Sequence, residues 1–157
     1  SHAYWQRLFE SSPRQLLFAF KVPEDVTVKR FPAHDRYGAR AGMENETFLN
    51  ANVFRELFAA PLVPYQDRVA TLIFEFGAFG RSAFEEQAPF VEQLDRFLRE
   101  LPEGFRYAVE VRNPEFLDVE YFGCLRSHGV AHVFNAWTRM PELGTLARAG
   151  RDSHRRA

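Results

Sequence analysis

YAVEVRNPEF, at residues 107–116, is an apolar strand interrupted by two charged residues. Glu110 and Arg112 are two positions apart, so a strand places both on one face and its apolar side chains on the other. A charge inside a buried strand costs free energy unless it is paired or used. The stretch therefore predicts a buried strand that carries a site on one face.

Four nearly continuous apolar runs predict strands, at residues 16–22, 70–76, 107–112 and 131–137. Such runs are typical of parallel strands that are covered on both faces. Helical patterns lie before and between them, at about residues 4–10, 48–58, 90–101 and 119–128. We expect Asn45 to cap the second helix, and Gly129 to end the last one in a left-handed conformation. Strands that alternate with helices predict an α/β fold with a parallel sheet.

The two faces of the predicted strands differ in character. One face holds bulky apolar side chains, such as Phe74 and Val109, that suit packing against helices. The other holds smaller side chains and becomes polar toward the carboxyl end of each strand. This pattern is typical of barrel strands, whose inward residues carry function at the carboxyl-terminal mouth. We therefore predict a partial TIM (β/α) barrel of about four parallel βα units, ahead of a doubly wound open sheet.

Composition limits the classes of function. The 157 residues suit one domain, and a net charge of -1 gives no general attraction to nucleic acid or membranes. No apolar run approaches the roughly 20 residues that span a bilayer. The single cysteine, Cys124, excludes an internal disulfide, and we expect a cytoplasmic protein. The 17 phenylalanines predict aromatic layers between sheet and helices.

The chain divides simply along its length. We expect a single partial barrel domain over residues 4–145 and a basic tail over residues 146–157 that frays. Residues 1–3 look like the remnant of a cleaved tag.

Polar residues gather at the carboxyl ends of the predicted strands. They are Lys21, Glu75, Glu110, Arg112, Asn135 and Trp137. Glu110 or Glu75 would act as general acid or base, while Lys21 and Arg112 would bind an anionic group. Trp137 would form a stacking wall of the pocket or plug the top of the barrel. The alternative is an ion-pair network in which the cations and acids only neutralise each other.

A metal site is not expected. The two glutamates and Asn135 offer oxygen atoms, but no histidine ends a strand in the same phase. His132 should point toward the helices, and His128 should close a helix. Cys124 is expected to be a small buried apolar residue. We predict no metal and no other cofactor.

Residues 23–46 show no clear periodicity, and loops of this length are usually functional or disordered. Their basic residues, including Arg30 and Arg36, could bind a nucleic-acid backbone, with Tyr37 stacking on a base. The alternative is a solvated loop whose cations pair with Asp35 and Glu44.

Three segments together resemble a known family: FAFKVPEDVT at 18–27, LIFEFG at 72–77 and AVEVRNPEF at 108–116. They are similar to the YecE-type domain of unknown function, a TIM-barrel family, over about residues 13–143. Family members are longer, so the chain resembles the middle of the barrel, as a fragment or a naturally short member. By analogy with sugar-isomerase and endonuclease-like barrels, the resemblance implies a ligand that carries a sugar or phosphate.

Two functions remain open from the sequence. The first is a barrel that binds a small anionic ligand at its mouth, with a hydrolase- or isomerase-like enzyme as its catalytic form. The second is a non-catalytic nucleic-acid-binding module that uses residues 29–40. In either case we expect no membrane partner, and self-association to cover the open strand edges.

Overall fold

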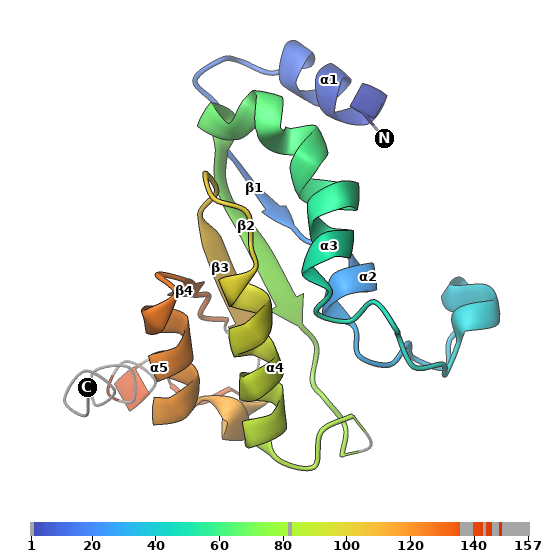
Figure 1. Cartoon of the computed structure of the whole chain (residues 1–157), viewed down its shortest axis with the longest axis vertical. Coiled ribbons are helices and arrows are strands. Elements are labelled where there is room, and N and C mark those ends of the chain that lie inside the picture. Colours follow the sequence, from blue (N-terminus) through green and yellow to red (C-terminus); the bar gives the residue numbers. More distant parts are fainter. Residues whose placement is uncertain (1, 82, 136–139, 143, 146–147, 149–157) are drawn as a thin grey trace.

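The computed structural model describes residues 2–81, 83–135, 140–142, 144, 145 and 148. One sheet contains all the named strands, in the order β1 (Phe18–Lys21), β2 (Val69–Phe76), β3 (Tyr107–Val111) and β4 (Ala131–His132). Every neighbouring pair is parallel, and helices lie between successive strands (Figure 1). The predicted α/β class with four parallel βα units is confirmed, and it is consistent with a partial β/α barrel.

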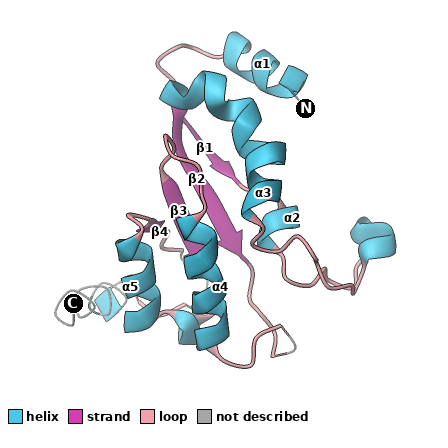
Figure 2. Cartoon of the chain, viewed as in Figure 1, coloured by secondary structure: helices cyan, strands magenta, loops and turns pink. Residues whose placement is uncertain are grey.

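Within the described residues, five α-helices have defined bounds. They are α1 (His2–Ser11), α2 (Glu24–Thr27), α3 (Ala51–Phe54), α4 (Gln87–Arg99) and α5 (Val119–Ser127). The 3₁₀ or π segments are η1 (Asp35–Arg40), η2 (Arg55–Ala59), η3 (Ala60–Arg68) and η4 (Pro114–Phe116). Figure 2 shows α3, α4 and α5 on the same side of the sheet. Within the described ranges, no helix has the length and apolar character needed to cross a membrane.

The face of the sheet toward these helices is packed with aromatic rings. Phe74 of β2 is fully buried, and its ring centroid lies 5.2 Å from that of Phe54 and 5.0 Å from that of Phe97. Phe76 and Val109 on the same face are also fully buried. Burying each such side chain contributes about 1.5–3 kcal/mol relative to leaving it exposed. The predicted apolar face and its aromatic layers are confirmed.

A side-chain cap and a glycine define the two ends of helix α5. The Asp118 side chain accepts a hydrogen bond from the Tyr121 backbone N–H at 3.0 Å, which satisfies one of the free donors of the first turn. Gly129 has a φ of 64°, the left-handed conformation predicted for it.

The cap predicted for Asn45 was wrong. Asn50 caps α3 instead, accepting from the backbone N–H groups of Asn52 and Val53. Asn45 is buried, and its amide donates to the carbonyl oxygens of Asp25 at 2.9 Å and Val28 at 2.7 Å. A buried amide with partners about 20 residues away satisfies loop backbone groups. These contacts order the loop over residues 23–46 although its sequence has no periodicity.

The last strand is shorter than predicted. Only Ala131 and His132 pair with β3 as a strand, and the Val133 N–H then donates a final hydrogen bond to the Val109 carbonyl at 2.9 Å. Residues 133–135 continue outside the ladder. The end of the predicted strand, including Trp137, lies outside the described residues.

Candidate functional site

Four charged side chains meet at the carboxyl end of the sheet, and we call Lys21, Glu75, Glu110 and Arg112 the mouth cluster. Lys21 ends β1, and Glu75 of β2 lies beside Glu110 of β3 in the parallel register. Arg112 directly follows β3. Alternation along the strands places these side chains on the face opposite the buried phenylalanines. The prediction that one phase of the strands collects polar groups therefore holds for these four residues.

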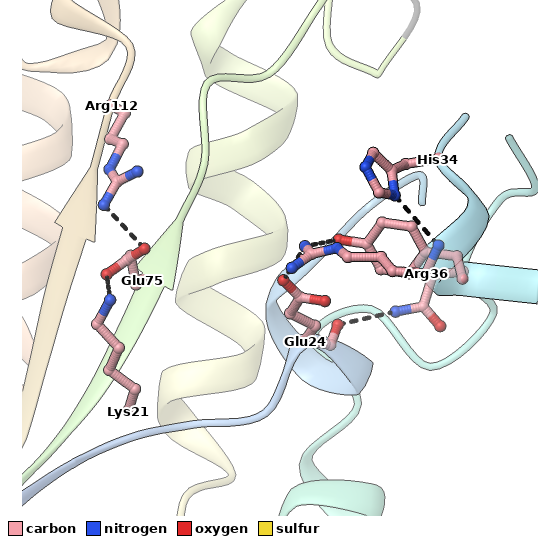
Figure 3. A network of polar contacts seen from close by, with 8 residues as sticks. Lys21, Glu24, His34, Arg36, Glu75 and Arg112 are labelled. Atoms are coloured by element: carbon pink, nitrogen blue, oxygen red, sulfur yellow. Dashed lines mark hydrogen bonds and ion pairs between the residues drawn. The ribbon is translucent and has the colours of Figure 1, made fainter. Parts of the chain in front are cut away.

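Glu75 joins two cations in this cluster (Figure 3). Arg112 Nη2 donates to Glu75 Oε1 at 2.9 Å, and Arg112 Nε donates to Glu110 Oε1 at 3.2 Å. The Lys21 ammonium forms an ion pair with the second Glu75 oxygen, Oε2, without the alignment of a hydrogen bond. Arg112 thus separates two carboxylates that would otherwise repel each other across adjacent strands.

Burial differs sharply between the acids and the cations. The Glu110 side chain is 9% exposed and that of Glu75 is 20%, whereas Arg112 is 37% and Lys21 is 64% exposed. The acids therefore lie inside and the cations at the rim. The ion-pair alternative describes these contacts correctly. Within the described residues, Arg112 directs hydrogen bonds to carboxylates only from Nε and Nη2. A guanidinium has five N–H donors, so donors remain that a ligand can use.

A buried asparagine holds the loops at this edge. The Asn113 side chain accepts from the Phe79 N–H at 2.6 Å and donates to the Phe79 carbonyl at 3.1 Å. These bonds connect the segment after β2 to the end of β3, next to Arg112. Asn113 was not among the residues predicted for the site. The available signal was an amide directly after a charged buried strand, which can both donate and accept.

Two further residues were predicted at this rim. Asn135 lies beyond β4 and is partly buried. Trp137 lies outside the described residues. Ion pairs and hydrogen bonds join the other four, Lys21, Glu75, Glu110 and Arg112.

The basic loop pairs most of its cations with nearby acids. Arg36 contacts Glu24 at 2.8 Å (Figure 3), and Arg40 contacts Asp25 at 2.8 Å. Two further contacts join Lys29 to Glu44 and Arg30 Nη1 to the Gly42 carbonyl oxygen. Pairing with Glu44 was predicted, whereas Glu24 and Asp25 replace the predicted Asp35.

Tyr37, the predicted stacking ring, is itself buried. Only 7% of the residue is exposed, and the Arg36 guanidinium lies 4.4 Å from its ring centroid. The ring therefore packs inside the loop instead of presenting a face to a base. A small hollow of about 130 Å³ lies between Lys29, Arg30 and residues 77–79, which follow β2. The basic loop thus borders the carboxyl edge of the sheet.

Two histidines occupy the helical layer. His132 faces the helices as predicted, with Nδ1 2.9 Å from the Tyr121 hydroxyl, and burial lowers the pKa of His132 to about 4. His128 follows α5, and its Nε2 lies 2.8 Å from Asp95 Oδ1 of α4. The hydrogen bond to His128 lowers the pKa of Asp95. This second pair was not predicted from the sequence, because it depends on how α4 packs against α5.

Cys124 of α5 lies close to the His128 and Asp95 pair. It is buried, as predicted, and burial, followed by the Asp95 charge, raises the pKa of its thiol to about 11. Burial therefore favours the protonated thiol over a thiolate nucleophile. We call Asp95, Cys124 and His128 the helix-layer cluster.

Comparison with known proteins identifies a family but no activity. The family model described as "Protein of unknown function DUF72" matches residues 1–152. No curated protein and no solved structure gives a significant match.

Proposed function

The chain belongs to the DUF72 family, and from this premise we propose that its mouth cluster binds a small anionic ligand carrying a phosphate or a sugar acid. The observation that supports this proposal most is the Arg112 guanidinium, which two carboxylates hold in place while 37% of the side chain stays exposed. A planar guanidinium with free N–H groups suits the oxygens of a phosphate or carboxylate.

The role that we propose for each charged residue depends on how exposed its side chain is. Lys21, the most exposed member, would meet the anionic group first and could move toward it from Glu75. Arg112 would orient the same group with its remaining donors. Arg30, beside the hollow at the end of β2, would extend the cationic surface to a larger ligand. Glu75 and Glu110 lie less exposed behind the cations, where a carboxylate can exchange a proton with a bound hydroxyl group.

Binding would rearrange the ion pairs. An anion at Lys21 competes with Glu75 for the same ammonium, so one carboxylate becomes available as a base when the ligand is present. Glu75 and Glu110 would then have a use beyond neutralising the cations. A carboxylate that acts as a base beside the bound ligand would support hydrolase- or isomerase-like chemistry. The ligand would determine which reaction takes place.

Binding of defined anions tests this proposal. Inorganic phosphate, a sugar phosphate and the same sugar without phosphate are titrated by calorimetry at low salt. We expect phosphate-bearing ligands to bind and the neutral sugar not to bind, and Arg112→Met to weaken binding at least tenfold. Arg40→Met is the matched control, because Arg40 is also half-exposed and ion-paired but belongs to the loop. Equal affinity in wild type and Arg112→Met would contradict the proposal.

Catalysis is tested separately from binding. For any ligand that is turned over, we expect Glu110→Gln to retain affinity within about threefold and to lose most of kcat. Unchanged turnover in both Glu110→Gln and Glu75→Gln would restrict the site to binding.

The nucleic-acid alternative stays a prediction, and the pairing of Arg36 and Arg40 with loop acids gives it no support. Self-association also stays a prediction. Its motivation is that β1 is an edge strand of the described sheet, preceded by Leu16 and Leu17, which are 46% and 58% exposed. Light scattering over a concentration series tests it, and a constant monomer mass would exclude it.

A further inference from the structure

A cysteine, a histidine and an aspartate converge in the helical layer, away from the mouth cluster. One potential ligand atom from each of Asp95, Cys124 and His128 lies within 4.8 Å of the other two. Together they offer sulfur, nitrogen and oxygen, the three ligand atoms that zinc uses in proteins. Within the described residues, this is the one such group of three or more.

The helix positions explain why the group forms. Cys124 and His128 are four residues apart on and just after α5, so both project from the same side of the helix. Asp95 faces them from α4, and its second oxygen contacts Arg99 one turn further along. The three residues lie on helices or directly at a helix end, not in a long loop.

The surroundings allow an ion to enter. Cys124 is 8% exposed, whereas the side chains of His128 and Asp95 are 17% and 35% exposed. His128 also lines a hollow of about 530 Å³ at the amino-terminal ends of the strands, together with Leu98 and Tyr107. The sulfur therefore lies at the inner end of the group and the carboxylate at its outer end.

We propose that Asp95, Cys124 and His128 bind a zinc-type divalent metal ion, with water completing a four-coordinate site. Ligand bonds of about 2.0–2.3 Å place tetrahedral ligand atoms roughly 3.3–3.7 Å apart. The group must therefore contract by about 1 Å, a change within the range of side-chain rotation.

The exchange on binding is balanced. The Cys124 thiol releases its proton to solvent as sulfur bonds to the metal. The proton that His128 Nε2 donates to Asp95 leaves that nitrogen, and the imidazole takes up a proton from solvent at Nδ1 instead, so the ring stays neutral and Nε2 can bind the metal. The hydrogen bond between Asp95 and His128 is thereby replaced by two metal bonds. A thiolate, a carboxylate and a neutral imidazole compensate the charge of a divalent ion. Arg99 stays on the outer carboxylate oxygen and fixes its direction. The high pKa of the buried thiol opposes this exchange, so we expect weaker binding than at a site of preformed thiolates.

Cobalt(II) titration of the whole chain tests the proposal, because a cobalt–thiolate bond produces a charge-transfer absorption band. Cys124 is the single cysteine of the sequence, so any such band reports this residue. We expect one cobalt ion per chain with this band, and loss of the band when zinc is added. Cys124→Ser should abolish it, while His128→Ala and Asp95→Asn should weaken cobalt binding at least tenfold. His34→Ala is the control, because His34 belongs to the basic loop.

Two results would overturn the proposal. One is the absence of the charge-transfer band in folded wild-type protein at excess cobalt. The other is a band whose cobalt affinity is unchanged in both His128→Ala and Asp95→Asn, with folding of each variant verified by circular dichroism. Arg112→Met separates this proposal from the mouth cluster, because it should leave the cobalt titration unchanged whatever it does to phosphate binding.

Discussion

The two faces of the central sheet are stabilised by different interactions. On the helix-facing side, Phe74, Phe76 and Val109 lose all contact with solvent. On the opposite side, Lys21 is exposed, and the buried Glu110 carboxylate is paired with the Arg112 guanidinium. One face is held by apolar packing and the other by charge pairing. The packed face therefore fixes the strand positions, while the charged face uses those positions to bring four charges together.

The largest expected effect is on the packed face. Phe74→Ala should lower the free energy of unfolding by about 3–5 kcal/mol, because the ring is fully buried among aromatic neighbours and its loss leaves a cavity. Urea denaturation measures this change. Leu57→Ala is the control, since Leu57 is 70% exposed, and should change stability by no more than about 0.5 kcal/mol. Similar losses of stability in both variants would contradict the inference that packing on this face stabilises the fold.

On the charged face, Arg112→Met should cost about 2–3 kcal/mol. The substitution leaves Glu75 and Glu110 side by side without the cation between them. This range lies below that for a fully buried pair, because Arg112 is 37% exposed. The free energy of unfolding of single and double variants measures it, and adding Glu110→Gln should recover part of the loss. Arg112→Met with wild-type stability would mean that the pairing contributes nothing to the fold.

Period two along the strands was enough to predict both faces and the four residues of the mouth cluster. Each of these residues lies inside or directly after a strand, where the phase is fixed by neighbouring apolar side chains. Local sequence did not identify the cap of α3 correctly, because Asn45 was predicted and Asn50 is the cap. Both are good caps and lie five residues apart, and tertiary hydrogen bonds to Asp25 and Val28 decide between them.

The helix-layer cluster could not be predicted in the same way. Asp95 and His128 are 33 residues apart, and their contact depends on the rotation of α4 and α5 against each other. Helical periodicity defines which side of each helix is apolar, but not which polar residues at the seam will meet. Cys124 was correctly predicted to be buried, yet burial alone did not reveal its neighbours.

A pH-dependent effect tests the polar end of the packed face. Burial lowers the pKa of His132 to about 4, below its ordinary 6.5, so the folded state resists protonation more than the unfolded state does. Stability is fully present above pH 6.5 and falls as the pH decreases toward 4. The Tyr121 hydroxyl and the Phe122 and Phe134 rings surround the imidazole. Between pH 7 and 5 the loss should be about 1.5–2 kcal/mol.

Urea denaturation of wild type and His132→Leu at both pH values measures this loss. We expect the variant to lose the His132 share of the pH dependence, whatever its stability at pH 7. His34→Ala should keep the wild-type dependence. The lowered pKa of Asp95 acts below its ordinary value of 3.8 and therefore outside this pH range. The same pH dependence in His132→Leu and wild type would contradict the assignment.

The smallest expected change in stability belongs to Lys21, and it gives the sharpest contrast between the two faces. Lys21→Met removes an ion pair whose lysine is 64% exposed, so the free energy of unfolding should change by less than about 1 kcal/mol. Under the proposed function, the same variant should lower phosphate affinity severalfold, because an exposed ammonium is the first cation that an anion meets. A stability loss as large as that of Phe74→Ala would make the charged face structural. Unchanged stability with weakened phosphate binding would instead show that residues of this face can be altered without loss of the fold, as a binding surface requires.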